Sequence, residues 1–457
     1  MICLTLPVFS GRYRLVLHFL ELFKKGRRQE RTGSGVTTRS YDCYEICKSE
    51  IMPLLLKSTT FRAFRNRNYA LFFTGQSISR MGMWMQRTAV IWVVYSMTHS
   101  SFMLGLTLFA EQFPSFLFSA LGGIVSDRYD RYKLILLTQS LSMVQAVILT
   151  VVTYTGHDSV WVLLVLSAVL GTINAFDVPA RQPLVHEMVN EPEDLPNALS
   201  LNSSLTNLAK MVGPALAGIV LSEWGAGTCF LVNTVSFIAI IVCLSLMKLP
   251  PQPPRPQKQK VGKELRDGFR YLCKTPEIGL PLLMLTLVSL LVLPYSTLLP
   301  VFAKVIFEGD ATTYGYIMGF IGLGAISGAF FLASLREGSR LKRILAVNTV
   351  ILGVSLVLFS RIDNLSVVLF FAVLIGFGAM AQTTVCNILV QTKSKPEMRG
   401  RAMSYQAMAA FGMMPLGGLL VGTLSEHIGA PASLLIQGIT ALLIVLCFYR
   451  FLWGRGR

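Results

Sequence analysis

Long runs of apolar residues, separated by short polar or charged stretches, fill the chain from residue 69 onward. A helix that spans a bilayer needs about 20 mainly apolar residues. Twelve segments meet this requirement, which predicts an all-α membrane protein with twelve transmembrane helices. The predicted spans cover residues 69–96, 102–125, 134–154, 159–180, 198–222, 227–248, 278–302, 313–335, 343–360, 365–389, 402–424 and 431–453.

The composition agrees with this class of protein. Hydrophobic residues make up 53% of the 457 residues and charged residues 14%, whereas a soluble protein carries about 25% charged residues. These values exclude a disordered chain, a disulfide-stapled secreted domain and an ordinary cytosolic enzyme. The formal net charge of +17 could indicate a nucleic-acid binder, so the placement of the basic residues matters.

The basic residues lie almost entirely in loops on one side of the predicted membrane. That side includes Arg181 and the segment 248–274, whereas the other side carries only Lys304 and Arg361. Since Lys and Arg accumulate in cytoplasmic loops, both termini are predicted to be cytoplasmic. The charge therefore reflects topology, with no nucleic-acid partner, and indicates a multi-pass protein of the cell inner (cytoplasmic) membrane.

No pattern indicates an enzyme, a metal site or a bound cofactor. The eight cysteines are scattered without a CxxC pair or a neighbouring histidine cluster. The five histidines lie at chain ends or in loops, and no nucleophile and base share one depth. There is also no G-x-x-x-x-G-K-[ST] loop, so an ATP-driven pump is not predicted.

The chain divides into two halves of similar length. Residues 52–248 hold the first six spans and residues 278–457 the last six. Segments 192–201 and 396–405, each entering the fifth span of its half, are identical at four positions. This similarity predicts two parallel six-helix repeats.

Residues 249–277 form a predicted cytoplasmic linker. Its first part is rich in proline, which lacks a backbone donor and favours extended conformations. The segment 261–274 places Leu265, Phe269 and Leu272 on one helical face. This pattern suits an amphipathic helix at the membrane surface, and a plain tether is the alternative.

Residues 1–51 differ from the rest of the chain. Arg12 and Arg14 interrupt the one apolar stretch, which is too short to span a bilayer, and no small-residue cleavage site follows it. Our hypothesis is that translation begins at Met52, which would make residues 1–51 an untranslated or disordered extension.

A first motif lies between the second and third spans, at Gly123, Asp127, Arg128 and Arg131. Glycine permits close helix approach, and an acid beside arginines can form charge-assisted bonds that hold one closure state. A plain positive-inside loop would explain the arginines but not Asp127. The pattern resembles the G-x-x-x-D-R/K-x-x-R-x-K/R signature of the major facilitator superfamily, in which it would act as a cytoplasmic gate.

A second motif, Gly213, Pro214 and Gly218, lies in the fifth span. It resembles in part the glycine-proline motif of superfamily members that export by antiport. The expected upstream glycine is absent from residues 208–212. Helix packing by small residues is the alternative to a role in transport.

A wider resemblance covers about residues 60–450. It is carried by Phe64–Tyr69 (FRNRNY), Gly82–Gln86 (GMWMQ), Pro179–Gln182 (PARQ), Asn197–Asn202 (NALSLN) and Arg399–Arg401 (RGR). These segments resemble the transmembrane secretion effector family of major facilitators, which includes enterobactin exporters. The resemblance implies a proton-driven exporter of small molecules that works by alternating access.

Four charged residues, Arg80, Arg87, Glu111 and Lys210, fall inside predicted spans of the first half. Charges inside a bilayer are costly and usually face a cavity with a partner. At about 1.5 Å per residue, Arg87 and Glu111 lie roughly 18 Å and 15 Å below the hairpin tip at residues 98–101. We therefore predict an ion pair that lines a cavity.

Glu111 is the best candidate for reversible protonation. A carboxylate beside an arginine stays ionised, so coupling would require the pair to separate during the cycle. The alternative is that Glu111 permanently neutralises Arg87. Lys210 could attract an anionic substrate, with a snorkelling packing role as its alternative.

These features favour a secondary active transporter that exports a lipophilic drug or a siderophore-like compound in exchange for protons. Alternatives are a lysophospholipid flippase, a solute importer or, in a different class, a non-transporting membrane receptor or scaffold. The expected partners are a small-molecule substrate, protons and membrane lipids, and a monomer is expected.

Overall fold

The computed structural model describes residues 59–189, 191–247, 261–335 and 340–453. The predictions for residues 1–51 and for the proline-rich part of the linker lie outside these ranges. The chain divides into two units. The described part of unit 1, residues 1–65, is the 3₁₀ helix η2 (Thr59–Arg65). Unit 2, residues 66–457, holds all the other described elements, and those elements are helical.

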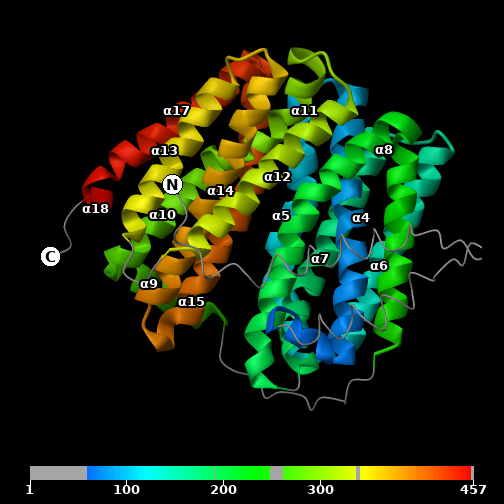
Figure 1. Ribbon diagram of the computed structural model, residues 1–457, viewed down its shortest axis with the longest axis vertical. Helices are drawn as coiled ribbons and strands as arrows, with labels where there is room; N and C mark the ends of the chain where they lie inside the picture. The colour runs from blue at the N-terminus through cyan, green and yellow to red at the C-terminus, as the bar shows by residue number, and fades with distance from the viewer. Residues whose placement is uncertain (1–58, 190, 248–260, 336–339, 454–457) are drawn as a thin grey trace, which may run out of the picture. The chain divides into compact units, whose positions relative to one another are not determined.

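Capping side chains mark where most helices of the first half begin. Asn66, Ser100, Asp130 and Ser159 each accept a hydrogen bond from a backbone N–H in the first turn. The helices are α4 (Arg67–Thr98), α5 (Ser101–Arg128), α6 (Arg131–Tyr154), α7 (Val160–Met188), η3 (Pro192–Asp194) and α8 (Leu195–Ser245) (Figure 1).

Helix α8 contains both the fifth and the sixth predicted span. Gly225, with φ of 77° and ψ of 176°, interrupts the helical backbone between them. Glycine adopts this positive φ without a steric penalty. The sequence predicted the two spans but left four residues between them, whereas the chain turns at one glycine.

The second half is less regular. Prolines 294 and 300 lack the backbone donor that an α-helix needs, and the seventh span is divided into four segments. A π-helical turn, η6, likewise interrupts the eleventh span. The elements are α9 (Val261–Lys274), α10 (Pro276–Leu291), η4 (Leu293–Leu298), α11 (Leu299–Val301), η5 (Phe302–Ile306), α12 (Ala311–Ala333), α13 (Leu341–Phe359), α14 (Leu365–Lys393), α15 (Pro396–Ala407), η6 (Met408–Gly412), α16 (Met413–Ile428), α17 (Ala430–Cys447) and α18 (Tyr449–Trp453).

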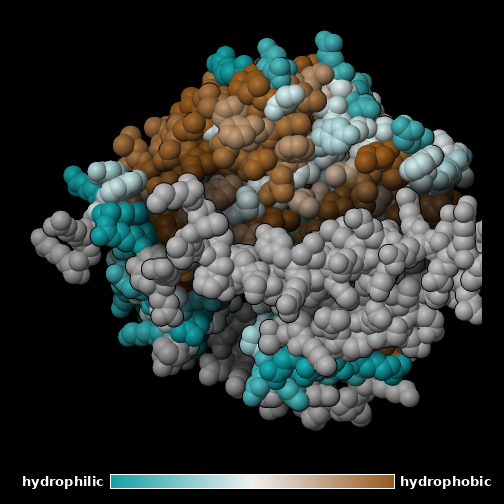
Figure 2. Space-filling model, in the orientation of Figure 1, coloured by the Kyte–Doolittle hydropathy of each residue, from teal (hydrophilic) through white to brown (hydrophobic). Residues whose placement is uncertain are grey.

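The described residues hold ten helical stretches that are long and apolar enough to cross a membrane. Dividing α8 at Gly225 and adding α4, which is 32 residues long, gives the twelve segments that the sequence predicts. The described surface in Figure 2 is largely hydrophobic, with hydrophilic residues at its margins. Large apolar side chains such as Trp161 and Phe330 are 67% and 73% exposed, as expected for contact with lipid.

Glycines bring neighbouring helices into close contact in both halves. Gly122 of α5 lies against the backbone of Ala175 in α7, and Gly376 of α14 lies against the backbone of Ile321 in α12. The second and fourth spans of each half thus cross through glycine. Two parallel repeats would produce this correspondence, and the repeat itself stays a prediction.

The glycine prediction for the first motif is wrong in one respect. A Cβ atom at Gly123 would meet nothing within 4 Å, whereas one at Gly122 would collide with α7. Gly123 faces away from the crossing because adjacent helical residues point about 100° apart.

The linker helix α9 forms as predicted, and its two described apolar residues of the predicted face differ in burial. Leu272 is 8% exposed and packs with Ile278 and Leu282, whereas Phe269 is 60% exposed near the ring of Tyr405. The side chain of Leu265 lies outside the described part of the chain.

The two halves meet at one end of their helices, here called the closed end. Its hydrogen bonds between described residues include Ser222 Oγ accepting from Thr312 Oγ1 at 2.9 Å and Glu426 Oε2 accepting from Ser100 Oγ at 3.1 Å. Gly218 of α8 lies against Gly315 of α12, so a Cβ at Gly218 would sit 2.9 Å from the Gly315 Cα. Small residues therefore permit this closure.

Replacing Gly218 with valine should force α8 and α12 apart at the closed end. In a Ser222→Cys/Thr312→Cys protein with a protease site in the linker, we expect disulfide cross-linking to slow at least fivefold. Gly400→Val is the control, since a Cβ at Gly400 would meet nothing within 4 Å. Equal cross-linking rates in the two variants would contradict this packing.

Candidate functional site

A cavity of about 280 Å³, here called the central cavity, lies between the two halves. Its walls come from α4, α5 and α8 of the first half and from η4, α12, α14 and α16 of the second. The charged residues in its lining are Arg87 and Lys210. Arg80 and Glu111, predicted with them, are not among its described lining residues.

Arg87 and Glu111 form an ion pair, with Arg87 Nε 3.1 Å from Glu111 Oε2. Their side chains are 23% and 18% exposed, so the pair is largely shielded from solvent. The guanidinium group of Arg87 also lies 5.0 Å from the ring centre of Trp84, a cation–π distance. The sequence placed these two charges at one depth, and their role in proton coupling stays a prediction.

Lys210 reaches the central cavity from α8. Its Nζ lies 5.9 Å from the ring centre of Trp84, so Trp84 contacts both cations of the cavity. Gly213, about one turn further along α8, lies against the Cβ of Trp84, and a side chain at this position would collide with it. Among the described residues, Lys210 has no carboxylate partner.

Arg80 lies in a polar network between α4 and α8. It donates to Gln76 Oε1 and Asn202 Oδ1, each at 3.3 Å, and to Thr206 Oγ1. All three partners are neutral oxygens. Arg80 therefore makes its described hydrogen bonds to neutral groups and forms no direct ion pair among the described residues.

A second ion pair, which was not predicted from the sequence, joins Asp177 and Arg181 of α7. Asp177 is 1% exposed and also accepts hydrogen bonds from Thr138 and Gln139, each at 2.9 Å. Arg181 further donates to Gln76 Oε1 at 2.8 Å, so Gln76 joins it to Arg80.

The predicted fourth span ends at residue 180, so the prediction places Arg181 in a loop and gives it no helical partner. Helix α7 continues to Met188. The spacing of four residues between an acid and an arginine, just after an apolar run, was a usable signal for a helical ion pair.

The first motif forms a salt bridge that its pattern did not predict. Arg131 is 7% exposed and donates to Glu187 Oε1 of α7 at 2.6 Å and to Ser126 O at 3.2 Å. Arg128 is exposed. The side chain of Asp127 lies outside the described residues. The arginine of this motif therefore pairs with an acid of another helix.

The second motif packs two helices against α8. Gly213 contacts Trp84 of α4, and Gly218 contacts α12 of the other half. Pro214 lies inside the helix and is buried. A Cβ on Gly315 would lie 2.9 Å from the carbonyl oxygen of Pro214. This motif therefore supports the central cavity on one side and the closed end on the other.

The fold is that of major facilitator transporters. A bacterial homologue of the human lysosomal transporter Spinster, in an inward-facing and unoccupied conformation, matches 85% of this chain and 99% of its own at a TM-score of 0.65 and 14% identity. The nucleoside transporter NupG matches 85% of this chain and 100% of its own at a TM-score of 0.65 and 13% identity. At these identities the match shows the fold alone.

The chain belongs to the transmembrane secretion effector family, whose model matches residues 58–454. It is therefore a multi-pass membrane transporter of small molecules and not an enzyme. The staphyloferrin A transporter of Staphylococcus aureus is 27% identical over 83% of this chain and 94% of its own length. Macrolide efflux protein A of Streptococcus pyogenes is 23% identical (82% and 93%), and the enterobactin exporter of Shigella flexneri is 25% identical (86% and 94%).

Replacing Asp177 with asparagine should destabilise the protein, because it leaves Arg181 buried without its counter-charge. Removing one member of a buried ion pair costs about 3–5 kcal/mol. We expect a clear fall in the apparent melting temperature in detergent, measured as a thiol-reactive dye reaches the buried Cys229 and Cys386.

The matched control is Asp363→Asn, at an exposed loop position, which should melt like the wild type. The double variant Asp177→Asn/Arg181→Gln should regain part of the lost stability. Equal melting of the Asp177 and Asp363 variants would show that the pair contributes nothing.

Proposed function

We propose that the protein exports small molecules across the cell inner membrane in exchange for protons, by alternating access. The observation that carries this proposal is the Arg87–Glu111 ion pair at the border of a cavity between the halves. An ionisable pair within membrane spans is expensive and is typical of proton and substrate pathways. The family and the printed functions of the relatives support export of siderophore- or drug-like compounds.

Glu111 is the proposed proton carrier. While Glu111 faces Arg87 at 3.1 Å, the guanidinium group favours the ionised carboxylate over the protonated one. A proton binds when the pair separates, and it leaves when the pair forms again. Exchange requires that the substrate and the proton bind in turn, so the substrate occupies the cavity while the Arg87–Glu111 pair is formed, and Glu111 takes up its proton after the substrate has left.

Alternating access requires the closed end to open. The hydrogen bonds to be broken there include those that join Glu426 and Ser425 of α16 to the start of α5 and the one that joins Thr312 to Ser222. At the other end, the Arg131–Glu187 pair lies within the first half and can hold α6 against α7 while the halves move. We assign the closed end to the outer side and both termini to the cytoplasm, and we expect a monomer built from two parallel six-helix repeats.

The test is proton flux in inverted membrane vesicles with an imposed pH gradient. Lipophilic drugs and catecholate siderophores are added to vesicles that hold wild-type protein, Glu111→Gln or Glu308→Gln. We expect an active compound to release protons with the wild type and with Glu308→Gln, whose carboxylate is exposed in a loop. Glu111→Gln should lower the flux at least tenfold, because it cannot change its charge.

The outcomes separate the parts of the proposal. Full flux with Glu111→Gln would remove Glu111 from coupling and leave it as the permanent partner of Arg87. Binding of a compound by the wild type without any flux would contradict proton-coupled export and favour a non-transporting receptor.

A further inference from the structure

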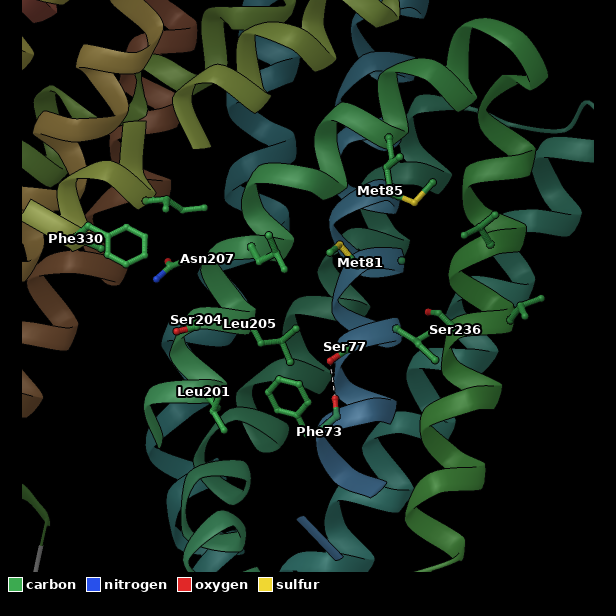
Figure 3. Close-up of a pocket in the computed structure, with 18 of the residues that line it drawn as sticks. Phe73, Ser77, Met81, Met85, Leu201, Ser204, Leu205, Asn207, Ser236 and Phe330 are labelled. Carbon is green, nitrogen blue, oxygen red and sulfur yellow. Dashed lines mark hydrogen bonds between the residues drawn. The ribbon is translucent and has the colours of Figure 1, made fainter. Parts of the chain in front are cut away.

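A second and larger cavity, here called the lateral groove, has a volume of about 1180 Å³. Its walls come from α4, from both parts of α8 and from α12 (Figure 3). Most of its lining is apolar, and the few polar side chains are serines and one asparagine. Representative lining residues are Phe73, Met81, Leu205, Asn207, Val235 and Phe330.

The lateral groove opens toward the lipid. Ile78, Leu208, Val235 and Phe330 line it and are 46%, 43%, 56% and 73% exposed. Large apolar side chains that are exposed on membrane-spanning helices contact acyl chains in the bilayer. An acyl chain can therefore reach this groove without crossing water.

The lateral groove adjoins the central cavity along the contact between α8 and α12. Asn207 of α8 lines both spaces. On α12, Ala325 lines the central cavity and the next residue, Ile326, lines the groove. The contact between α8 and α12, here called the α8–α12 seam, therefore separates the two spaces, and Asn207 borders both.

The charge near the seam is positive. Arg87 is balanced by Glu111 and Arg181 by Asp177, whereas Lys210 and Arg80 have no carboxylate partner among the described residues. Lys210 lies three residues from Asn207 and lines the central cavity. A cation inside a membrane protein that lacks a counter-charge is costly, so this arrangement favours an anionic group in the cavity.

The central cavity and the lateral groove differ in volume, so they suit different parts of a ligand. Sites for drug-sized ligands usually measure about 300–1,000 Å³. The central cavity, at about 280 Å³, suits a compact polar group, whereas the groove, at about 1180 Å³, accommodates a long apolar chain.

We infer that the α8–α12 seam admits a single-chain amphiphile with an anionic head group directly from the bilayer. The chain occupies the lateral groove and the head group binds at Lys210 in the central cavity. Asn207, whose amide makes no hydrogen bond among the described residues, donates to the head group as it passes. This inference rests on the proposed export function and adds its substrate class and entry route.

Dodecanoate is the probe, and dodecyltrimethylammonium is the cation with the same chain. Radiolabelled probe is titrated into wild-type protein in nanodiscs on scintillation beads, with empty nanodiscs subtracted. We expect saturable binding of dodecanoate and at least tenfold weaker binding of the cation. Lys210→Met should weaken dodecanoate binding at least tenfold.

Two variants fill the groove from opposite sides of the seam, Ala329→Trp on α12 and Leu208→Trp on α8. Leu208 is already exposed, so its replacement is compatible with folding even if the change at Ala329 is not. Each should weaken dodecanoate binding at least tenfold. The matched control is Val165→Trp, at a residue of α7 that is 60% exposed and outside the groove, which should bind like the wild type.

Unchanged binding in Lys210→Met would overturn the head-group site, and unchanged binding in both groove variants would overturn the route. Equal binding of the cation would overturn the choice of an anion. Proton flux is measured separately with drugs and siderophores. Flux without dodecanoate binding would refute this inference and leave the export function in place, whereas Lys210-dependent binding without any flux would refute export and leave the site in place.

Discussion

The cost of placing charge inside a bilayer governs the arrangement of the first half of this protein. Two carboxylates, Glu111 and Asp177, each face one arginine at the level of the membrane-spanning helices. Arg80 is stabilised by three neutral oxygens. Each of these contacts joins different turns or different helices, so the charges also decide how α4, α5, α7 and α8 lie against one another.

The second half has a complementary role. It contributes no charged residue to the described lining of the central cavity, and it meets the first half through small residues. Gly315 packs against Gly218, and the backbone of Gly418 lies against Gly105. Small residues let the backbones of the two halves approach closely, so the contact depends on the fit of the two surfaces. The charged residues that line the central cavity thus lie in the first half, whereas both halves contribute small residues to the contact between them.

Much of the fold could be predicted from the sequence, because a bilayer imposes a length and a hydropathy on each span. Helix ends could be predicted less well. Ending the fourth span at residue 180 concealed the Asp177–Arg181 pair, and a charged helix end reads in the sequence like a loop. Which of Gly122 and Gly123 meets α7 depends on the rotation of α5, which a local motif does not specify.

Some features of the candidate site could be predicted from the sequence and others could not. The depth of Arg87 and Glu111 follows from counting residues along two adjacent helices, so their proximity could be predicted. The partner of Arg131 could not, because Glu187 is distant in sequence and belongs to another helix. The lateral groove also had no sequence signal, since its lining comes from four separate segments whose apolar residues resemble ordinary lipid-facing positions.

The π-helical turn η6 has a geometric consequence for the closed end. A π-helical turn holds one more residue than an α-helical turn, and one residue corresponds to about 100° of rotation in an α-helix. The face of α16 that carries Gly418 and Gly422 toward α5 is therefore turned by this amount relative to α15. A continuous α-helix through residues 408–412 would present a different side of α16 to α5. The one extra residue therefore determines which face of α16 packs against the first half.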